Sequence, residues 1–146
     1  MRAVRKTEHN AYEILYHFVA PTKYRKAIFG ISDREQTLLS TCKEIEERYE
    51  IIFDQIGIDT NHVHFLISAV PKFSPSKIIQ IVKSITAREL FQKHPDLKKE
   101  LWGGELWSDG FYVSTVSEHG NKDVIRGYLR KQGQSFEHHQ LKLFNF

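Results

Sequence analysis

The segment Asn61–Ser68, which reads NHVHFLIS, has an apolar residue at every second position from Val63 onward. Successive side chains of a β-strand point to opposite faces of its sheet, so this alternation predicts a strand with those apolar residues in the core. His62 and His64 then lie together on the opposite face. Neutral imidazole is a common ligand of divalent metals, so the pair indicates a metal site. The alternative is two unrelated histidines on a solvated strand face.

The segments on either side predict alternating strands and helices. Residues 33–50 and 76–93 repeat apolar side chains at the i, i+3/i+4, i+7 spacing of amphipathic helices. Residues 59–61 form a tight turn that joins two strands into a hairpin. The expected strands cover residues 12–20, 51–58, 61–68 and 110–116, and residues 95–109 are expected to be irregular.

The resulting βαββαβ order predicts an α+β, ferredoxin-like fold, in which two helices cover one face of an antiparallel sheet. The histidine pair then lies on the uncovered face. A further C-terminal helix is expected over 122–139, although Gly127 and Gly133 weaken it. The length suits a single domain over residues 1–146.

Composition restricts the class of protein. Apolar residues make up 40 % of the chain and charged residues 27 %, an ordinary balance for a globular domain. The single cysteine, Cys42, excludes an internal disulfide and a multi-cysteine zinc site, and suits a reducing compartment. No apolar run approaches the roughly 20 residues of a membrane span, and no signal peptide is evident. We therefore expect a cytoplasmic protein without a membrane partner.

The net charge of +3 is unevenly distributed along the chain. Residues 32–71 carry three Lys or Arg against eight acidic residues, whereas residues 72–146 carry twelve against eight. This pattern predicts an acidic face set apart from a basic remainder that is interleaved with aromatic residues. Such a remainder suits a polyanion, with aromatic rings available to stack on unpaired bases.

Tyr128 and Gln132 are four residues apart in the expected last helix, so they share one helix face. There they can face a metal held by the histidine pair, with the amide oxygen as a ligand and the tyrosine as a nucleophile. Arg126, Arg130 and Lys131 surround them with positive charge suited to a phosphate. The alternative is a half-buried aromatic residue beside a solvated polar one.

Several segments together resemble the HUH endonucleases, specifically the small single-tyrosine transposases of insertion sequences that move as single-stranded DNA. The matching segments are 16–18 (YHF), 23–25 (KYR), 61–66 (NHVHFL), 106–116 (LWSDGFYVSTV) and the helix with Tyr128 and Gln132. They occur in the expected order and cover about residues 10–140. The chain also resembles the relatives of these transposases that are associated with repeated palindromes.

The resemblance implies a role for each matching position. His62 and His64 match the metal-binding histidine pair of the family. Tyr128 matches its nucleophilic tyrosine, and Gln132 matches its third metal ligand. The cofactor implied is one divalent ion per active site, Mg²⁺ or Mn²⁺. The assembly implied is a homodimer, with the tyrosine helix and the histidine pair of each site coming from one subunit or from both.

The activity that the resemblance implies is that of a DNA transposase. Such an enzyme cleaves and rejoins single-stranded DNA at hairpin-flanked element ends through a covalent 5′-phosphotyrosine, and would associate with the nucleoid when bound to DNA. One alternative is a host-retained nuclease that processes palindromic hairpins. The other is a non-catalytic module that binds single-stranded nucleic acid on a ferredoxin-like sheet.

For the basic, histidine and tryptophan side chains outside these motifs, the sequence indicates a role less specifically. The basic residues Lys23, Arg25 and Lys26 fit either DNA contacts or a solvated loop. His17 fits either a place near the site or a structural role. Trp102 and Trp107 are expected to pack in the core or a dimer interface, the alternative being base-stacking platforms. His119, His138 and His139 are expected at the surface, the alternative being a second metal site.

Overall fold

The computed structural model describes residues 5–6 and 11–116. The expected last helix therefore lies outside the described residues, together with the predictions that fall on it or near it: Tyr128, Gln132, Arg126, Arg130, Lys131, His119, His138 and His139. Among the described residues, no helix is long and apolar enough to cross a membrane.

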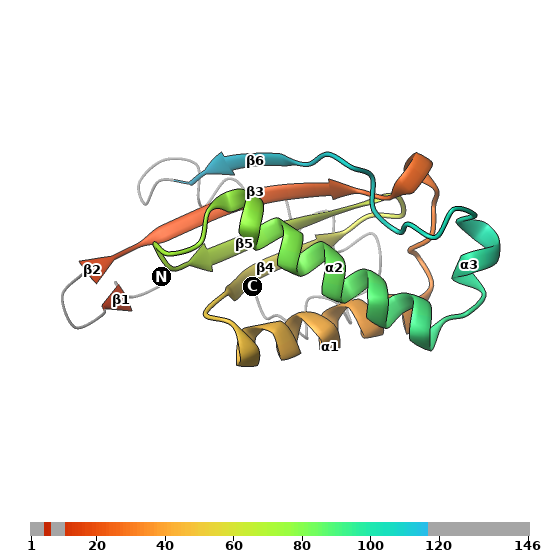
Figure 1. Ribbon diagram of the computed structural model, residues 1–146, viewed down its shortest axis with the longest axis horizontal. Coiled ribbons are helices and arrows are strands. Elements are labelled where there is room, and N and C mark those ends of the chain that lie inside the picture. The colour runs from red at the N-terminus through yellow and green to blue at the C-terminus, as the bar shows by residue number, and fades with distance from the viewer. Residues whose placement is uncertain (1–4, 7–10, 117–146) are drawn as a thin grey trace.

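The elements follow one another in the order that the sequence predicts (Figure 1). Their bounds are β1 (Arg5–Lys6), β2 (Ala11–Tyr12), β3 (Ile14–Pro21), η1 (Lys23–Arg25), α1 (Ser32–Arg48), β4 (Ile52–Ile58), β5 (His62–Ala69), α2 (Pro75–Lys93), α3 (Leu97–Glu100) and β6 (Tyr112–Thr115). The short strands β1 and β2 pair with each other, and α3 occupies part of the segment that was expected to be irregular.

The main sheet has the strand order β4-β5-β3-β6, and each neighbouring pair is antiparallel. With α1 between β3 and β4 and α2 between β5 and β6, this is the ferredoxin-like arrangement, so the predicted fold class is confirmed. The strand that carries the two histidines is therefore central, between β4 and β3, while β6 forms one edge.

The core lies between the sheet and the two long helices, which run side by side over one of its faces (Figure 1). Val63, Phe65 and Ile67 of β5 are fully buried in this core, as the alternation predicts. They meet apolar residues of α1 and α2, including Leu38 and Ile78, which are also fully buried. Since strand side chains alternate, His62 and His64 must point to the other face.

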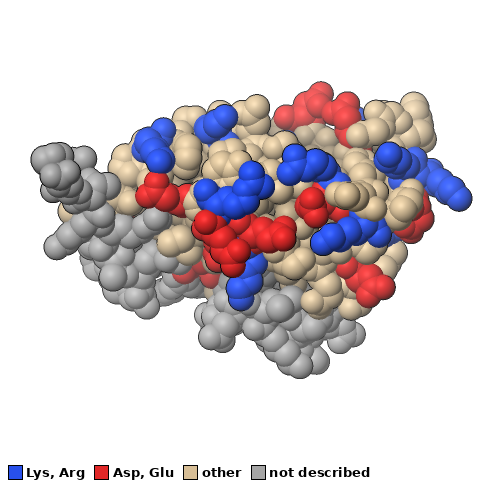
Figure 2. All heavy atoms as spheres, turned by 60° about the horizontal axis from the view of Figure 1, so that its bottom comes forward, with Lys and Arg blue, Asp and Glu red and all other residues tan. Residues whose placement is uncertain are grey.

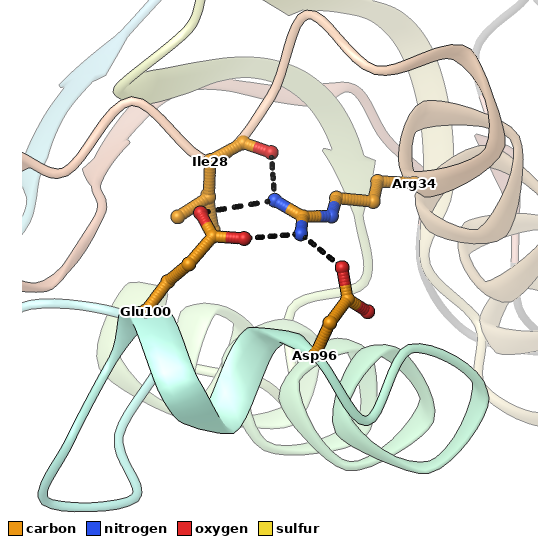
Figure 3. Close-up of polar contacts among 4 residues, drawn as sticks. All are labelled: Ile28, Arg34, Asp96 and Glu100. Carbon is orange, nitrogen blue, oxygen red and sulfur yellow. Dashed lines mark hydrogen bonds and ion pairs between the residues drawn. The ribbon is translucent and has the colours of Figure 1, made fainter.

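Arg34 links α1 to α3, because its buried guanidinium binds two carboxylates that are more exposed (Figure 3). Its side chain is only 2 % exposed, and its guanidinium donates to the Ile28 carbonyl oxygen at 2.9 Å. It also donates to the carboxylate of Asp96 at 2.7 Å and to both carboxylate oxygens of Glu100. Burial alone would lower the pKa of Arg34, but the hydrogen bonds and charges of the two acids outweigh burial and raise it.

The two tryptophans have different environments. Trp107 is buried, and its indole N–H donates to Oγ1 of Thr86 at 3.0 Å, so its predicted place in the core is confirmed. Trp102 is 71 % exposed and so does not pack in the core, whereas the other place predicted for it, a dimer interface, stays a prediction. It lies in the turn after α3, where Gly103 and Gly104 have φ angles of +102° and +81° and lead the backbone along the surface.

The surface on the α1 side carries both signs of charge. Figure 2 shows acidic side chains gathered near the middle of this view, but Lys and Arg side chains surround them. The acidic face predicted from residue counts is therefore less uniform than expected, because Lys and Arg side chains lie beside the acids in this view.

Candidate active site

Cross-strand register places the two histidines of β5 beside β3. His64 lies opposite Val19 and His62 lies opposite Pro21, at the end of the strand next to the hairpin turn. Their ring centroids are 5.0 Å apart, and the ring planes are inclined by 72°. His64 is buried and the side chain of His62 is 17 % exposed. The pair is thus partly shielded from solvent yet open at the His62 end.

Each imidazole of the pair has a hydrogen-bond partner at Nδ1. Nδ1 of His62 lies 2.8 Å from Oδ1 of Asn61, and Nδ1 of His64 lies 3.0 Å from Nε2 of His17. With Asn61 as the acceptor, His62 carries its proton on Nδ1, so Nε2 is its basic nitrogen. If His64 likewise donates from Nδ1 to His17, its own Nε2 becomes the ligand-type nitrogen.

The structure brings His17 to the predicted site, where the sequence left its role open. Its ring plane is nearly parallel to that of His64, with an inclination of 8° and the centroids 5.2 Å apart, and the two rings meet at the edges that share the hydrogen bond. His17 follows the period-2 pattern of β3 and lies on the same sheet face as the pair, which is the only signal of its place that the sequence contained.

Burial keeps these imidazoles neutral. Burial, together with the neighbouring His17 and His62, which act in the same direction, lowers the pKa of His64 to about 3. Burial also lowers the pKa of His17 and that of His62, although the carboxylate of Asp59 partly opposes the shift at His62. At neutral pH all three rings therefore keep a lone pair, which is the form that binds a metal ion. The donor chemistry of the pair fits a divalent cation.

Two histidines alone do not complete a metal site. Within the part of the chain that the structure describes, no group of three or more His, Cys, Asp or Glu residues is arranged to hold a metal ion. The carboxylate of Asp59 lies close to the pair, with Oδ2 at 3.9 Å from Nε2 of His62. The sequence had indicated Asp59 only as a turn residue. Gln132, the predicted third ligand, lies outside the described residues.

The loop after β3 holds three basic residues near the histidine pair. Its start is tied to the hairpin turn, since the backbone N–H of Thr22 donates to the carbonyl oxygen of Asn61 at 3.0 Å. Arg25 and Lys26 are exposed, and the positive charge of Arg25 contributes to the lowered pKa of His62. Lys23 is directed elsewhere: its Nζ lies 3.6 Å from Glu105 and 3.7 Å from Asp109.

Known proteins of similar sequence all point to one family. A family model described as "Transposase IS200 like" matches residues 10–132. The ISDra2 transposase TnpA of Deinococcus radiodurans is 28 % identical over 129 residues, which cover 88 % of this chain and 91 % of that protein. The transposase for insertion sequence element IS200 of Salmonella typhimurium is 27 % identical over 124 residues, which cover 85 % and 80 % of the two chains.

Solved structures agree with this result. A crystal structure from Deinococcus radiodurans R1 matches with a TM-score of 0.67 and 28 % identity, covering 88 % of this chain and 97 % of that chain. The REP associates tyrosine transposase bound to a REP hairpin matches with a TM-score of 0.55 at 10 % identity, covering 87 % and 70 %, and so shares the fold. The family match spans β3, the histidine strand and the region of Tyr128 and Gln132. The chain belongs to the IS200-like transposase family, and its activity is that of a transposase.

Proposed function

We propose that this transposase cleaves and rejoins single-stranded DNA through a covalent 5′-phosphotyrosine in a metal-dependent site. The observation that carries the proposal is the pair of neutral imidazoles, His62 and His64, on the sheet face opposite the helices. Neutral nitrogen ligands on one strand face are suited to a divalent ion beside a phosphate.

In this proposal His62, His64 and Gln132 hold one Mg²⁺ or Mn²⁺ ion, with Asp59 beside it. Such an ion, when bound, neutralises charge that develops on the phosphate oxygens. Asn61 and His17 hold the two imidazoles through their Nδ1 atoms, which fixes the direction of each Nε2.

Tyr128 is the proposed nucleophile. Its phenolic oxygen forms a bond to the phosphorus of the scissile phosphodiester as the phenol loses its proton. The bond between phosphorus and the 3′ oxygen breaks, and that oxygen takes up a proton and leaves as a free 3′ hydroxyl. Rejoining reverses these steps with a 3′ hydroxyl as the attacking group, so the phosphotyrosine conserves the energy of the bond and no ATP is needed.

The proposed substrate is a single strand that folds into a hairpin. The REP associates tyrosine transposase is bound to a REP hairpin, and we infer the same kind of partner here. Phosphate contacts are assigned to the basic residues near the site and on the expected last helix: Lys23, Arg25, Lys26, Arg126, Arg130 and Lys131. Affinity should then fall steeply as the salt concentration rises, because phosphate contacts release counterions.

A covalent-adduct assay tests this proposal. The wild-type chain is incubated with Mn²⁺ and single-stranded DNA from the sequences flanking its gene. The strand keeps the scissile phosphodiester intact and begins shortly 5′ of it, so that the short fragment with the free 3′ hydroxyl diffuses away after cleavage and the intermediate is trapped. We expect an adduct that survives denaturant in the wild type and is absent from Tyr128→Phe. The matched control Tyr49→Phe should form the adduct normally, as should Tyr112→Phe.

The outcome separates the candidate functions. DNA binding without any adduct would support the non-catalytic module and overturn the proposed mechanism. An adduct at Tyr49 or Tyr112 would overturn the assignment of the nucleophile. A host-retained hairpin nuclease would form the same adduct. It is distinguished from a mobile-element transposase by the absence of subterminal palindromes on both sides of the gene.

We further propose a homodimer with two active sites, in which the tyrosine helix of one subunit serves the histidine pair of the other. Mixing Tyr128→Phe and His64→Ala subunits tests this arrangement, since only a trans dimer regains one intact site. Background activity after co-refolding would show a cis site, and a monomer in light scattering would exclude the dimer.

A further inference from the structure

Two large aromatic side chains are exposed together beside the proposed active site. Tyr24 is 57 % exposed and Trp102 is 71 % exposed, although they come from separate loops. Their rings are stacked, with centroids 5.7 Å apart and planes inclined by 26°. Aromatic side chains of this size are usually largely buried, so an ordered, exposed pair indicates a surface that binds a partner.

The backbone of the Tyr24 loop holds the aromatic pair in a defined place. Tyr24 and Arg25 both have left-handed backbone angles, with φ of 57° and 52°, which non-glycine residues adopt rarely and at some energetic cost. Thr22 anchors the loop: its N–H donates to the carbonyl oxygen of Asn61 at 3.0 Å, and its Oγ1 lies 2.7 Å from the carbonyl oxygen of Lys26 and 3.0 Å from that of Asn61. Asn61 precedes His62, so the loop begins at the hairpin that carries the histidine pair.

Cations surround the aromatic pair. Nζ of Lys23 lies 5.6 Å from the centroid of the Tyr24 ring, and Arg25 and Lys26 follow directly and are exposed. Exposed aromatic faces with adjacent cations are the arrangement that binds single-stranded nucleic acid, because bases stack on the rings while phosphates meet the charges. An apolar protein partner would cover the exposed cations of Arg25 and Lys26 without supplying counterions.

We propose that Tyr24 and Trp102 form a stacking platform for an unpaired base of the DNA strand that enters the active site. The outer face of Trp102 receives the base, and Arg25 and Lys26 contact the adjoining phosphates. The identity of the ligand, a single DNA strand, rests on the proposed function. The histidine site contacts a phosphate of that strand, and the platform adds a contact to one of its bases.

Binding of a fluorescein-labelled 20-mer of thymidylate to the full-length chain tests the platform. Fluorescence anisotropy is measured in EDTA, so that no cleavage interferes. We expect Trp102→Leu to weaken binding by about fivefold or more, the size of effect that loss of one stacked base produces. Trp102→Phe keeps an aromatic face and should bind nearly as well as the wild type, whereas leucine keeps only apolar bulk.

The salt dependence separates stacking from charge. Trp102→Leu should leave the slope of log affinity against log salt unchanged, whereas Lys26→Ala should lower its magnitude by about 0.7, the value for one contact to a single strand. The control Lys98→Ala removes an exposed cation on α3 and should change neither quantity. In addition, the strand should quench the fluorescence of Trp102 more than that of the buried Trp107, so the quenching disappears in Trp102→Phe.

Equal affinity of Trp102→Leu and the wild type for the thymidylate strand would overturn the platform. So would a wild-type chain that does not bind the strand. The adduct assay reports on the proposed function independently, because it depends on Tyr128 and the histidine pair. An adduct together with unaltered binding by Trp102→Leu would refute the platform alone.

Discussion

Arg34 on α1 and His64 on β5 are both almost completely buried, with the Arg34 side chain 2 % exposed and His64 5 % exposed. Arg34 keeps its charge in the interior because two carboxylates and a backbone carbonyl accept hydrogen bonds from its guanidinium (Figure 3). His64 has another histidine on each side, and burial holds it in the neutral form.

The difference separates a structural role from a functional one. The guanidinium of Arg34 donates hydrogen bonds to Ile28, Asp96 and Glu100, and these bonds join α1 to α3. Grouping neutral imidazoles creates a place where a cation is favourable. Arg34 is therefore expected to affect stability and His64 to affect activity.

The largest effect is expected from His64→Ala. Loss of a direct metal ligand should reduce DNA cleavage below about 1 % of the wild-type rate, since even indirect partners of metal ligands change affinity or activity about 10- to 100-fold. Adduct formation measured with Mn²⁺ checks this, and an EDTA-treated wild type should lose activity to the same extent. Undiminished cleavage in excess EDTA would contradict the metal role.

Arg34→Met should lower the free energy of unfolding by about 2 kcal/mol or more, because the Ile28 carbonyl loses its buried donor and the link to α3 is broken. The remaining acids, Asp96 and Glu100, are 64 % and 42 % exposed and can be solvated, which limits the loss. Urea denaturation measures the change. Cleavage per folded molecule should stay near the wild-type value, and its loss would break the proposed separation of roles.

Stability should fall as the pH is lowered below about 6.5. The unfolded chain protonates His64 near that pH, whereas the folded chain does so only at a pKa of about 3. The contribution of neutral His64 is therefore complete above pH 6.5 and is lost progressively as the pH falls toward 3, by about 1.4 kcal/mol for each pH unit. Urea denaturation in EDTA at pH 7, 6 and 5 should show a steeper loss for the wild type than for His64→Phe, and equal slopes would contradict it.

His17→Phe removes the Nδ1 partner of His64 but keeps an aromatic ring at this position. Without that hydrogen bond the His64 imidazole is less well oriented, so Mn²⁺ affinity should fall by about tenfold. Titration of Mn²⁺ followed by electron paramagnetic resonance measures this without relying on activity. His17→Gln can offer an acceptor to Nδ1 and should recover part of the affinity, whereas a purely structural His17 would show no such recovery.

The smallest effect is expected at the exposed ion pair between Lys72 and Glu50. Their charged atoms are 2.8 Å apart, but the side chains are 63 % and 56 % exposed. Solvent and salt screen such pairs, so Lys72→Ala should change the free energy of unfolding by less than about 1 kcal/mol. A loss as large as that of Arg34→Met would show that burial is not what distinguishes the two clusters.

Much of the fold could be predicted because the local patterns are strong. The period-2 alternation in β5 placed Val63 in the core and His62 on the opposite face, and the helical periodicities located α1 and α2 within one or two residues. The short helix α3 was missed because four residues are too few to show a helical period. Trp102 does not pack in the core, contrary to one of the two places predicted for it, because hydrophobicity alone does not reveal the path of a loop.

The sequence by itself determined the order of the elements, the face on which the histidine pair lies and the family to which the chain belongs, because these depend on local periodicity and on motifs at short spacing. Only the tertiary structure decided which distant residues meet those motifs. The register of β3 against β5 brings His17 to His64, and the paths of two loops bring Tyr24 to Trp102. Such contacts depend on strand register and loop geometry, which sequence periodicity does not contain.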